Sequence, residues 1–246
     1  MKRAILGLAL LCVAFSPSRA EVAWWPSAGI SGPVSAIVVQ TSTNYVVAAV
    51  QGSNPGIYRS TNRGASFTKV ATFTNPMRLT QVGGMVWAAT SQGLYKSGNL
   101  TTWTAVTSGL PAGKAVSYVG RSDPFGLQMY ATVASGTLRG LYRSLNTGTT
   151  WTRVIANTGY RAVAQGHQCG TAENAVVFAG GLLSPGGPSC TMSISTDNGD
   201  TWSCSSFSYS VNDLQVNCYN GPDFKSVYLT SGELNVAYRG ENLGAS

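Results

Sequence analysis

Four similar segments spaced along the chain constrain its fold more than any other feature. They read GIYRSTNRGASFTKV (56–70), GLYKSGNLTTWTAV (93–106), GLYRSLNTGTTWTRV (140–154) and MSISTDNGDTWSCS (192–205). Each segment begins with a strand-like alternation of residues, turns around an Asn or Asp, and resumes at an aromatic residue. Self-similarity of this kind predicts stacked or radially arranged units.

The residues of the turns have a clear physical purpose. Asn or Asp can fold its side-chain oxygen onto nearby backbone N–H groups, and a Gly two residues later supplies positive φ in three of the turns. The aromatic residue that follows covers the neighbouring strand with a large apolar surface. The residues that we assign to this structural role are Ser60, Asn62, Gly64, Phe67, Ser97, Asn99, Trp103, Ser144, Asn146, Gly148, Trp151, Ser195, Asp197, Gly199 and Trp202.

These turns resemble the Asp-box, or BNR, repeat, whose pattern is Ser-x-Asp-x-Gly-x-Thr-Trp. The segment STDNGDTW (195–202) matches at every position, and SLNTGTTW (144–151) matches at all but Asn146. STNRGASF (60–67) has three substitutions, and SGNLTTW (97–103) is one residue shorter and lacks the Gly. The resemblance implies the β-propeller fold of secreted sialidase-like and sortilin-like proteins, with the boxes at peripheral turns away from the ligand face.

Five pairs of apolar segments lie around these turns, and each pair fits an inner strand followed by a second strand. They span 35–39 and 45–50, 77–82 and 85–90, 115–120 and 128–133, 161–166 and 175–180, and 212–217 and 226–231. We therefore expect an all-β fold, namely a five-bladed β-propeller of four-stranded antiparallel blades.

The two ends of the chain carry matching half-motifs. The last unit ends in YRGENLGAS (238–246) without an outer strand, whereas WWPSAGISGPVSAIVV (24–39) near the start resembles WTAVTSGLPAGKAVSYV (103–119). We expect residues Ala23–Pro26 to pair with Leu234–Arg239, so that the N-terminal strand closes the ring and removes an exposed sheet edge. A piece of a larger propeller is the alternative.

The first twenty residues predict export. Lys2 and Arg3 precede the apolar run AILGLALLCVAF, which ends at SPSRA. This pattern is typical of a secretory signal, and it is too short to span a bilayer. We therefore expect a signal peptide (1–20), a single propeller domain (21–246) without a membrane span, and a secreted or periplasmic location.

Cysteine usage agrees with an oxidising compartment. Four cysteines remain after the expected cleavage, which favours two disulfides. Cys190–Cys204 and Cys169–Cys218 are the expected pairs, and the other pairings remain open. His167 is the only histidine and no CxxC spacing occurs, so we expect neither a metal nor another cofactor.

Charge bounds the class of partner. The formal net charge is +7, and Lys2, Arg3 and Arg19 of the expected signal peptide contribute three of the 16 Lys and Arg residues. This charge lacks the dense basic face of nucleic-acid-binding proteins. By resemblance, the face where the inner strands start is the one that sialidase-like enzymes use. We expect on it the candidate ligand residues Arg78, Lys114, Arg139, Tyr160, Arg161, Asp213 and Glu233, although ordinary solvated charges explain them equally well.

The expected function is non-catalytic binding of a glycan or of another extracytoplasmic protein. The cations would focus a positive field on an acidic ligand, and we expect a monomer. The alternatives are a glycoside hydrolase, sialidase-like or other, and a factor similar to those that assemble photosystem II. Hydrolysis normally needs two facing carboxylates, for which Asp213 and Glu233 are the candidates. The motifs around Arg78, Arg139 and Arg161 do not match the arginine triad of sialidases.

Overall fold

The computed structural model describes residues 27–121, 127–156, 159–166, 176–181, 190–205, 207, 209–217, 226–231 and 236–241. The expected signal peptide, the expected closing strand at Ala23–Pro26, the pair Cys169 and Cys218, and Glu233 lie outside the described residues. All regular secondary structure in the described ranges is β-strand, arranged as five antiparallel sheets with their strands in chain order.

The first three sheets have four strands each. The first sheet consists of β1 (Val34–Gln40), β2 (Tyr45–Val50), β3 (Gly56–Ser60) and β4 (Thr68–Ala71). The second consists of β5 (Pro76–Val82), β6 (Met85–Thr90), β7 (Gly93–Ser97) and β8 (Thr104–Ala105). The third consists of β9 (Val116–Arg121), β10 (Met129–Val133), β11 (Gly140–Ser144) and β12 (Thr152–Ala156).

The fourth sheet again has four strands, whereas the fifth has three. The fourth consists of β13 (Tyr160–Gly166), β14 (Val176–Gly181), β15 (Met192–Ser195) and β16 (Ser203–Cys204). The fifth consists of β17 (Asp213–Asn217), β18 (Ser226–Ser231) and β19 (Val236–Glu241). The five expected pairs of inner and second strands are therefore all present, and the fifth unit lacks an outer strand among the described residues.

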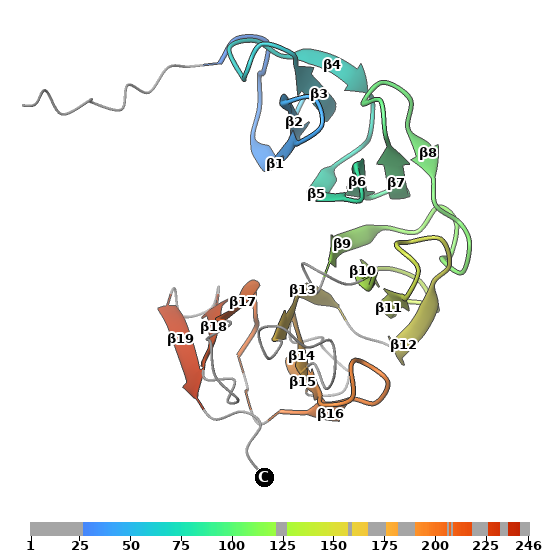
Figure 1. Cartoon of the computed structure of the whole chain (residues 1–246), viewed down its shortest axis with the longest axis vertical. Helices are drawn as coiled ribbons and strands as arrows, with labels where there is room; N and C mark the ends of the chain where they lie inside the picture. Colours follow the sequence, from blue (N-terminus) through green and yellow to red (C-terminus); the bar gives the residue numbers. More distant parts are fainter. Residues whose placement is uncertain are drawn as a thin grey trace, which may run out of the picture.

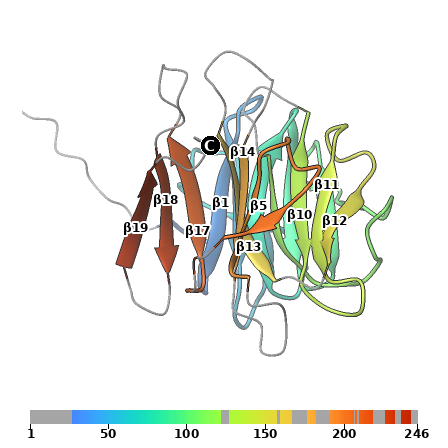
Figure 2. The same cartoon turned by 90° about the horizontal axis from the view of Figure 1, so that it is seen from below.

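The five sheets follow one another around an arc (Figure 1). The first strand of each sheet lies on the inner side of the arc, where β1, β5, β9, β13 and β17 contact one another in succession. Seen from the side, the strands run along the axis of the arc and the connecting loops gather at its two ends (Figure 2). The first and fifth sheets stand at opposite ends of the arc, so the expected closure of a ring is not shown.

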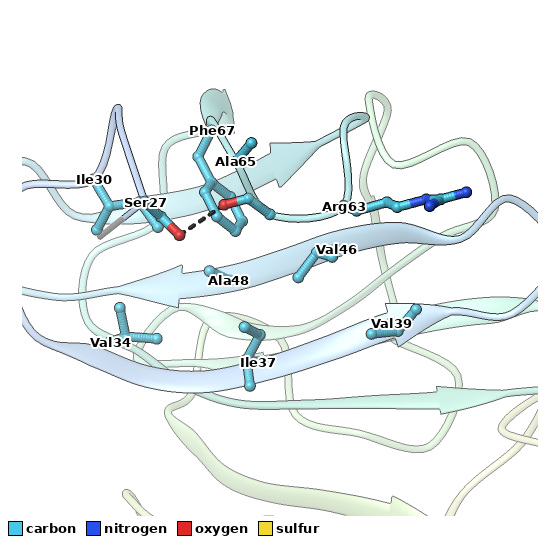
Figure 3. A pocket seen from close by; sticks show the side chains of 11 residues that line it. Ser27, Ile30, Val34, Ile37, Val39, Val46, Ala48, Arg63, Ala65 and Phe67 are labelled. Atoms are coloured by element: carbon cyan, nitrogen blue, oxygen red, sulfur yellow. Dashed lines mark hydrogen bonds between the residues drawn. The ribbon is translucent and has the colours of Figure 1, made fainter. Parts of the chain in front are cut away.

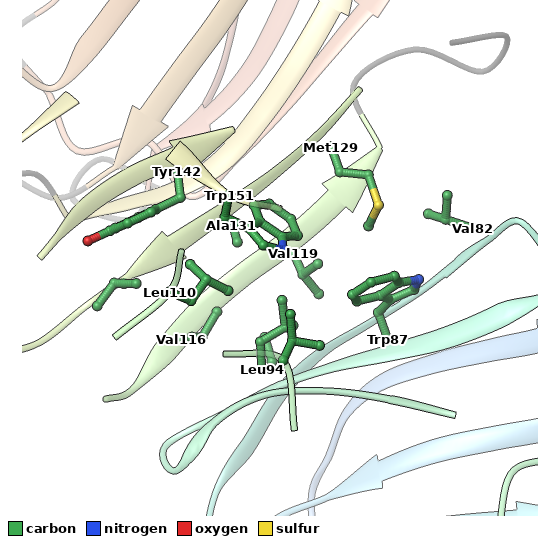
Figure 4. Close-up of a cluster of buried hydrophobic side chains, with 13 residues drawn as sticks. Val82, Trp87, Leu94, Leu110, Val116, Val119, Met129, Ala131, Tyr142 and Trp151 are labelled. Carbon is green, nitrogen blue, oxygen red and sulfur yellow. The ribbon is translucent and has the colours of Figure 1, made fainter. Parts of the chain in front are cut away.

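Large side chains fill the space between successive sheets. Between the second and third sheets, Trp87 and Trp151 meet edge to face with 6.4 Å between ring centroids, and Val119 packs in the same cluster (Figure 4). Tyr130 and Trp202 form the same kind of contact between the third and fourth sheets, at 6.1 Å. Edge-to-face pairs of this geometry add to the free energy gained by burial. The aromatic residue of each turn is thus part of the contact with the preceding sheet.

The four repeated turns, residues 60–67, 97–103, 144–151 and 195–202, use their polar side chains internally. In the third turn, Ser144 Oγ donates to Asn146 Oδ1 and accepts the Gly148 N–H (2.9 and 2.8 Å), and Asn146 Oδ1 accepts the Thr150 N–H (2.9 Å). The first and fourth turns repeat this pattern with equivalent residues. These side chains hold the hairpin and are not free to bind a ligand.

The second turn shows the cost of its missing residue. Leu100 adopts the left-handed conformation, with φ of 62°, where the other turns place a Gly. The indole N–H of Trp151 donates to the carbonyl oxygen of Gly148 (3.2 Å), whereas the indole N–H of Trp103 is buried and has no partner in the described structure. The shorter turn therefore keeps the aromatic packing and loses one hydrogen bond.

The segment before the first sheet docks as the sequence comparison predicts. The Phe67 N–H donates to the carbonyl oxygen of Ala28 (2.8 Å), and the Trp151 N–H donates to that of Ser108 (3.1 Å). Residues 27–30 and 107–110 thus make the same contact with the turn of the sheet that follows them. A disulfide joins Cys190 and Cys204, as expected.

Candidate functional site

The candidate site lies at the end of the arc where the inner strands begin. There the register shifts by one residue in four inner strands, at Ser35, Met77, Ser117 and Arg161. Such β-bulges re-aim the neighbouring side chains. The hydroxyls of Ser35 and Ser117 donate to the carbonyl oxygens of Pro76 and Tyr160 on the next inner strand (2.7 and 3.4 Å). The bulges therefore also connect successive sheets at this end.

These registers separate two of the candidate cations. Arg161 occupies the bulge position that Ser117 holds in the third sheet, and its side chain is exposed. Arg78 aligns instead with Tyr118, one position further along the strand. Its guanidinium lies 5.0 Å from the centre of the Tyr118 ring, on the neighbouring inner strand. Arg78 therefore stacks between two sheets, whereas Arg161 faces solvent.

The third sheet gathers cations around the loop 134–139 between β10 and β11. The loop is fixed to the start of the sheet, because the Ala134 N–H donates to the carbonyl oxygen of Ala115 (2.7 Å). Lys114 runs along the loop: a Cβ atom built on Gly136 would lie 3.4 Å from Lys114 Cε. Arg139 belongs to the loop, and Arg153 Nη1 donates to the carbonyl oxygen of Thr137 (3.4 Å).

We name Lys114, Arg139 and Arg153 the third-sheet cation cluster. Sequence reasoning found the first two and missed Arg153, because Arg153 lies on the outer strand β12 and reaches the loop only through the fold. The signal that could have found it is the length of the side chain opposite Tyr142, with which it is paired in the sheet.

Tyr118 links the charges at the centre of the arc. It is buried, and its hydroxyl donates to the carbonyl oxygen of Val163 (3.0 Å). Burial raises the pKa of Tyr118, the Arg78 charge and this hydrogen bond oppose the rise, and the Asp213 charge adds to it. Arg78 and Asp213 are therefore both close enough to act on the same phenol, although they come from the second and fifth sheets.

Tyr160 and two loop residues are engaged in the fold. Tyr160 is buried between the third and fourth sheets, and its hydroxyl bonds to Ser193 Oγ (2.5 Å). Gln51 Nε2 donates to the carbonyl oxygen of Pro76 (2.9 Å), and Asn54 Oδ1 accepts from Lys69 Nζ (2.7 Å). The structure thus gives Tyr160, Gln51 and Asn54 structural partners.

The described carboxylates divide between the turns and the candidate site. Asp197 accepts hydrogen bonds within its own turn, and Asp200 forms an ion pair with Arg143 (2.6 Å). Asp213 stands at the start of β17, where its Oδ1 accepts the Leu214 N–H (3.0 Å). Its expected partner Glu233 lies outside the described residues, so a catalytic pair is not on view.

Metal-binding and membrane-spanning features were searched in the same described ranges. There, no group of three or more His, Cys, Asp or Glu residues could hold a metal ion. Over these ranges, too, the structure has no helix long and apolar enough to cross a membrane.

Solved structures show the fold to which this chain is similar. An ancestral GH74 enzyme matches with a TM-score of 0.64 and 18% identity over 90% of this chain, and the Niastella koreensis GH74 enzyme matches with 0.60 and 21% over 85%. The chain spans 31% of the length of each of these enzymes. YCF48 bound to a D1 peptide matches with a TM-score of 0.53 and 14% identity, over 82% of this chain and 63% of the other.

Sequence comparisons are silent where the structural ones are not. No protein-family model matches the chain, and no curated protein matches it. At these identities the structural likeness establishes the fold alone. The sheets of this protein are therefore those of the β-propeller superfamily to which the GH74 and YCF48 structures belong.

Proposed function

We propose that this protein is a non-catalytic binding propeller, and that it holds an anionic ligand at the third-sheet cation cluster. The observation that carries the proposal is the uncompensated charge of Lys114, Arg139 and Arg153 around one fixed loop. The sole ion pair between two described residues is Arg143–Asp200, which belongs to the fourth turn. The cluster thus keeps its positive field for a partner.

Two neighbouring cations extend this surface. Arg161 is exposed on the fourth sheet, and Arg78 lies on the second sheet against Tyr118. Exposed charges of one sign attract an acidic partner over about a Debye length, roughly 8 Å at physiological ionic strength. We therefore expect weak binding that salt reverses, to an acidic glycan or to an acidic protein surface.

Both ligand classes occur among the structural neighbours, in enzymes named by a glycoside hydrolase family and in a propeller bound to a peptide. A hydrolase remains the second candidate because Asp213 stands at the start of an inner strand on this face. It would need a second carboxylate opposite Asp213. A panel of fluorogenic glycosides separates the two functions, since turnover that is lost in Asp213→Asn would favour the hydrolase.

The proposal includes an extracytoplasmic location. The Cys190–Cys204 disulfide supports it, because disulfides persist in oxidising compartments. We also propose that the segment Ala23–Pro26 supplies the outer strand that the fifth sheet lacks. The contact of Ala28 with Phe67 supports this, since it places the chain just after that segment as the internal repeat requires.

Charge reversal tests the binding proposal. Arg139→Glu changes the cation cluster, and Arg63→Glu changes the net charge equally at the exposed first turn, far along the chain from the cluster. On a sulfated polysaccharide matrix at low salt, we expect Arg63→Glu to be retained like the parent and Arg139→Glu, or Lys114→Glu with Arg139→Glu, to elute early. Equal retention of all variants, or a parent that is not retained, would refute the proposed site.

A further inference from the structure

The two ends of the arc expose positions that are buried everywhere else in the repeat. On the inner strands, Ile37 aligns with four aliphatic residues that are each at most 7% exposed, namely Leu79, Val119, Val163 and Leu214. Ile37 itself is 63% exposed. On the second strands, Tyr228 aligns with the buried residues Val47, Trp87, Tyr130 and Phe178, and it is 41% exposed.

Each internal interface joins one member of each set. Trp87 of the second sheet packs in one cluster with Val119 of the third, and Phe178 of the fourth sheet packs with Leu214 of the fifth. The clusters of the other two interfaces contain the equivalent pairs Val47 with Leu79 and Tyr130 with Val163. The rule leaves one pair unmade, Tyr228 of the fifth sheet with Ile37 of the first.

The turn glycines give an independent indication of the same missing contact. A Cβ atom built on Gly148 would lie 2.3 Å from the Trp87 ring, and one on Gly199 would lie 2.0 Å from the Tyr130 hydroxyl. These glycines therefore receive the aromatic side chain of the preceding sheet. The equivalent Gly64 in the first turn has nothing within 4 Å of such an atom. The place that an aromatic residue fills in the other two turns is open here.

The exposed face of the first sheet is apolar and hollowed. Val34, Ile37 and Val39 project from β1 beside Phe67 and Ile30, and the hollow between them and the first turn measures about 790 Å³ (Figure 3). The corresponding face of the fifth sheet presents Tyr228 among Gln215 and Thr230. One end thus offers an aliphatic hollow, and the other offers the aromatic side chain that the repeat places in such a hollow.

We propose that the fifth sheet of a second copy of this chain packs on the first sheet, with Tyr228 seated against Ile37, Gly64 and Phe67. The two faces of one chain stand at opposite ends of the arc, and its four internal interfaces are already filled (Figure 1). A second copy brings both faces at once, so two copies joined head to tail bury all four end faces. Heterologous contacts of this kind form a closed ring when the rotation permits. This pairing replaces the expectation of a monomer.

Mass measurements on the purified protein test the pairing. By light scattering or sedimentation at micromolar concentration we expect twice the mass of the chain, and the pairing should persist at 1 M NaCl because the interface is apolar (~1 M is ample to screen charges). Tyr228→Ala and Ile37→Glu should each weaken the pairing by at least about tenfold, the effect of losing a central aromatic or apolar contact. Leu145→Glu is the control, since Leu145 is 58% exposed but lies in a turn outside both end faces.

Cross-linking distinguishes a second copy from closure within one chain. Ala65→Cys and Tyr228→Cys, made in separate chains and then mixed and oxidised, can join only between copies, and we expect a covalent dimer of the two variants. A bond that forms solely when both cysteines are in one chain would show that the fifth sheet closes on its own first sheet. That result, a monomer insensitive to Tyr228→Ala, or loss of pairing in Leu145→Glu alone would overturn the proposal.

Discussion

Replacing two equivalent glycines with alanine measures how much the contact between sheets contributes to stability. Gly64 and Gly148 both have positive φ, 89° and 75°, in turns with the same hydrogen bonds. An alanine in this conformation costs roughly 1–2 kcal/mol wherever it is placed. The two sites differ in their surroundings, because the new methyl group is unobstructed at Gly64 and meets the Trp87 ring at 2.3 Å at Gly148.

The magnitude at Gly148 follows from that contact. Trp87 is buried and packed against Trp151, so its ring has little room to move. Overpacking a filled core costs about 1–3 kcal/mol in addition to the backbone strain. We therefore expect Gly148→Ala to lower the free energy of unfolding by about 2–5 kcal/mol and Gly64→Ala by about 1–2 kcal/mol.

Urea denaturation followed by tryptophan fluorescence provides the assay. Both variants are made in the Tyr228→Ala background, so that pairing between copies does not contribute at Gly64. An unchanged m-value with a lower midpoint would identify a change in stability. Equal losses at the two glycines would refute the reasoning, because they would mean that the turns do not lock against the preceding sheet.

Three further predictions concern the turns and the ends of the chain. The pKa of Asp197 is lowered from 3.8 to about 2, chiefly by hydrogen bonds from Thr201, so its carboxylate stabilises the fold above pH ~4 and this contribution is lost as the pH falls towards 2. Asp197→Asn keeps the turn and should flatten this part of the pH profile of stability; an unchanged profile would be contrary evidence. Cys190→Ser with Cys204→Ser should cost about 3 kcal/mol in urea denaturation, given the 14-residue separation, and an equal midpoint would contradict this. Deleting residues 21–27 should lower the thermal midpoint by exposing a sheet edge, and no shift would count against the expected closing strand.

The sequence predicts the units of this fold because each unit carries its own local signals. The turn from Ser144 to Trp151 contains every donor and acceptor that its hairpin uses, so its structure depends on neighbouring residues. Apolar alternation likewise places the inner and second strands. The arrangement of the units around the arc depends on contacts between sheets, such as Trp87 with Trp151, and no local pattern sets the angle between them.

The candidate site was harder to predict, because it depends on register. A β-bulge adds one residue without a sequence signature, and one residue turns a side chain to the other face of the strand. Alignment of the repeats therefore treated Arg78 and Arg161 as equivalent, whereas the register sets Arg78 with Tyr118 and Arg161 with Ser117. Burial was equally hidden, since Tyr160 looks irregular in the repeat and yet bonds to Ser193 inside the core.

Hydrogen–deuterium exchange with a sulfated oligosaccharide tests the central claim most directly. At low salt we expect slower exchange in the loop 134–139 and in residues 114–117, and the protection should disappear in high salt and in Arg139→Glu. The four repeated turns should exchange at the same rate with and without the oligosaccharide, because their polar side chains are bonded within the fold. Protection confined to those turns, or protection of the loop that high salt does not reverse, would contradict an anionic ligand at the third-sheet cation cluster.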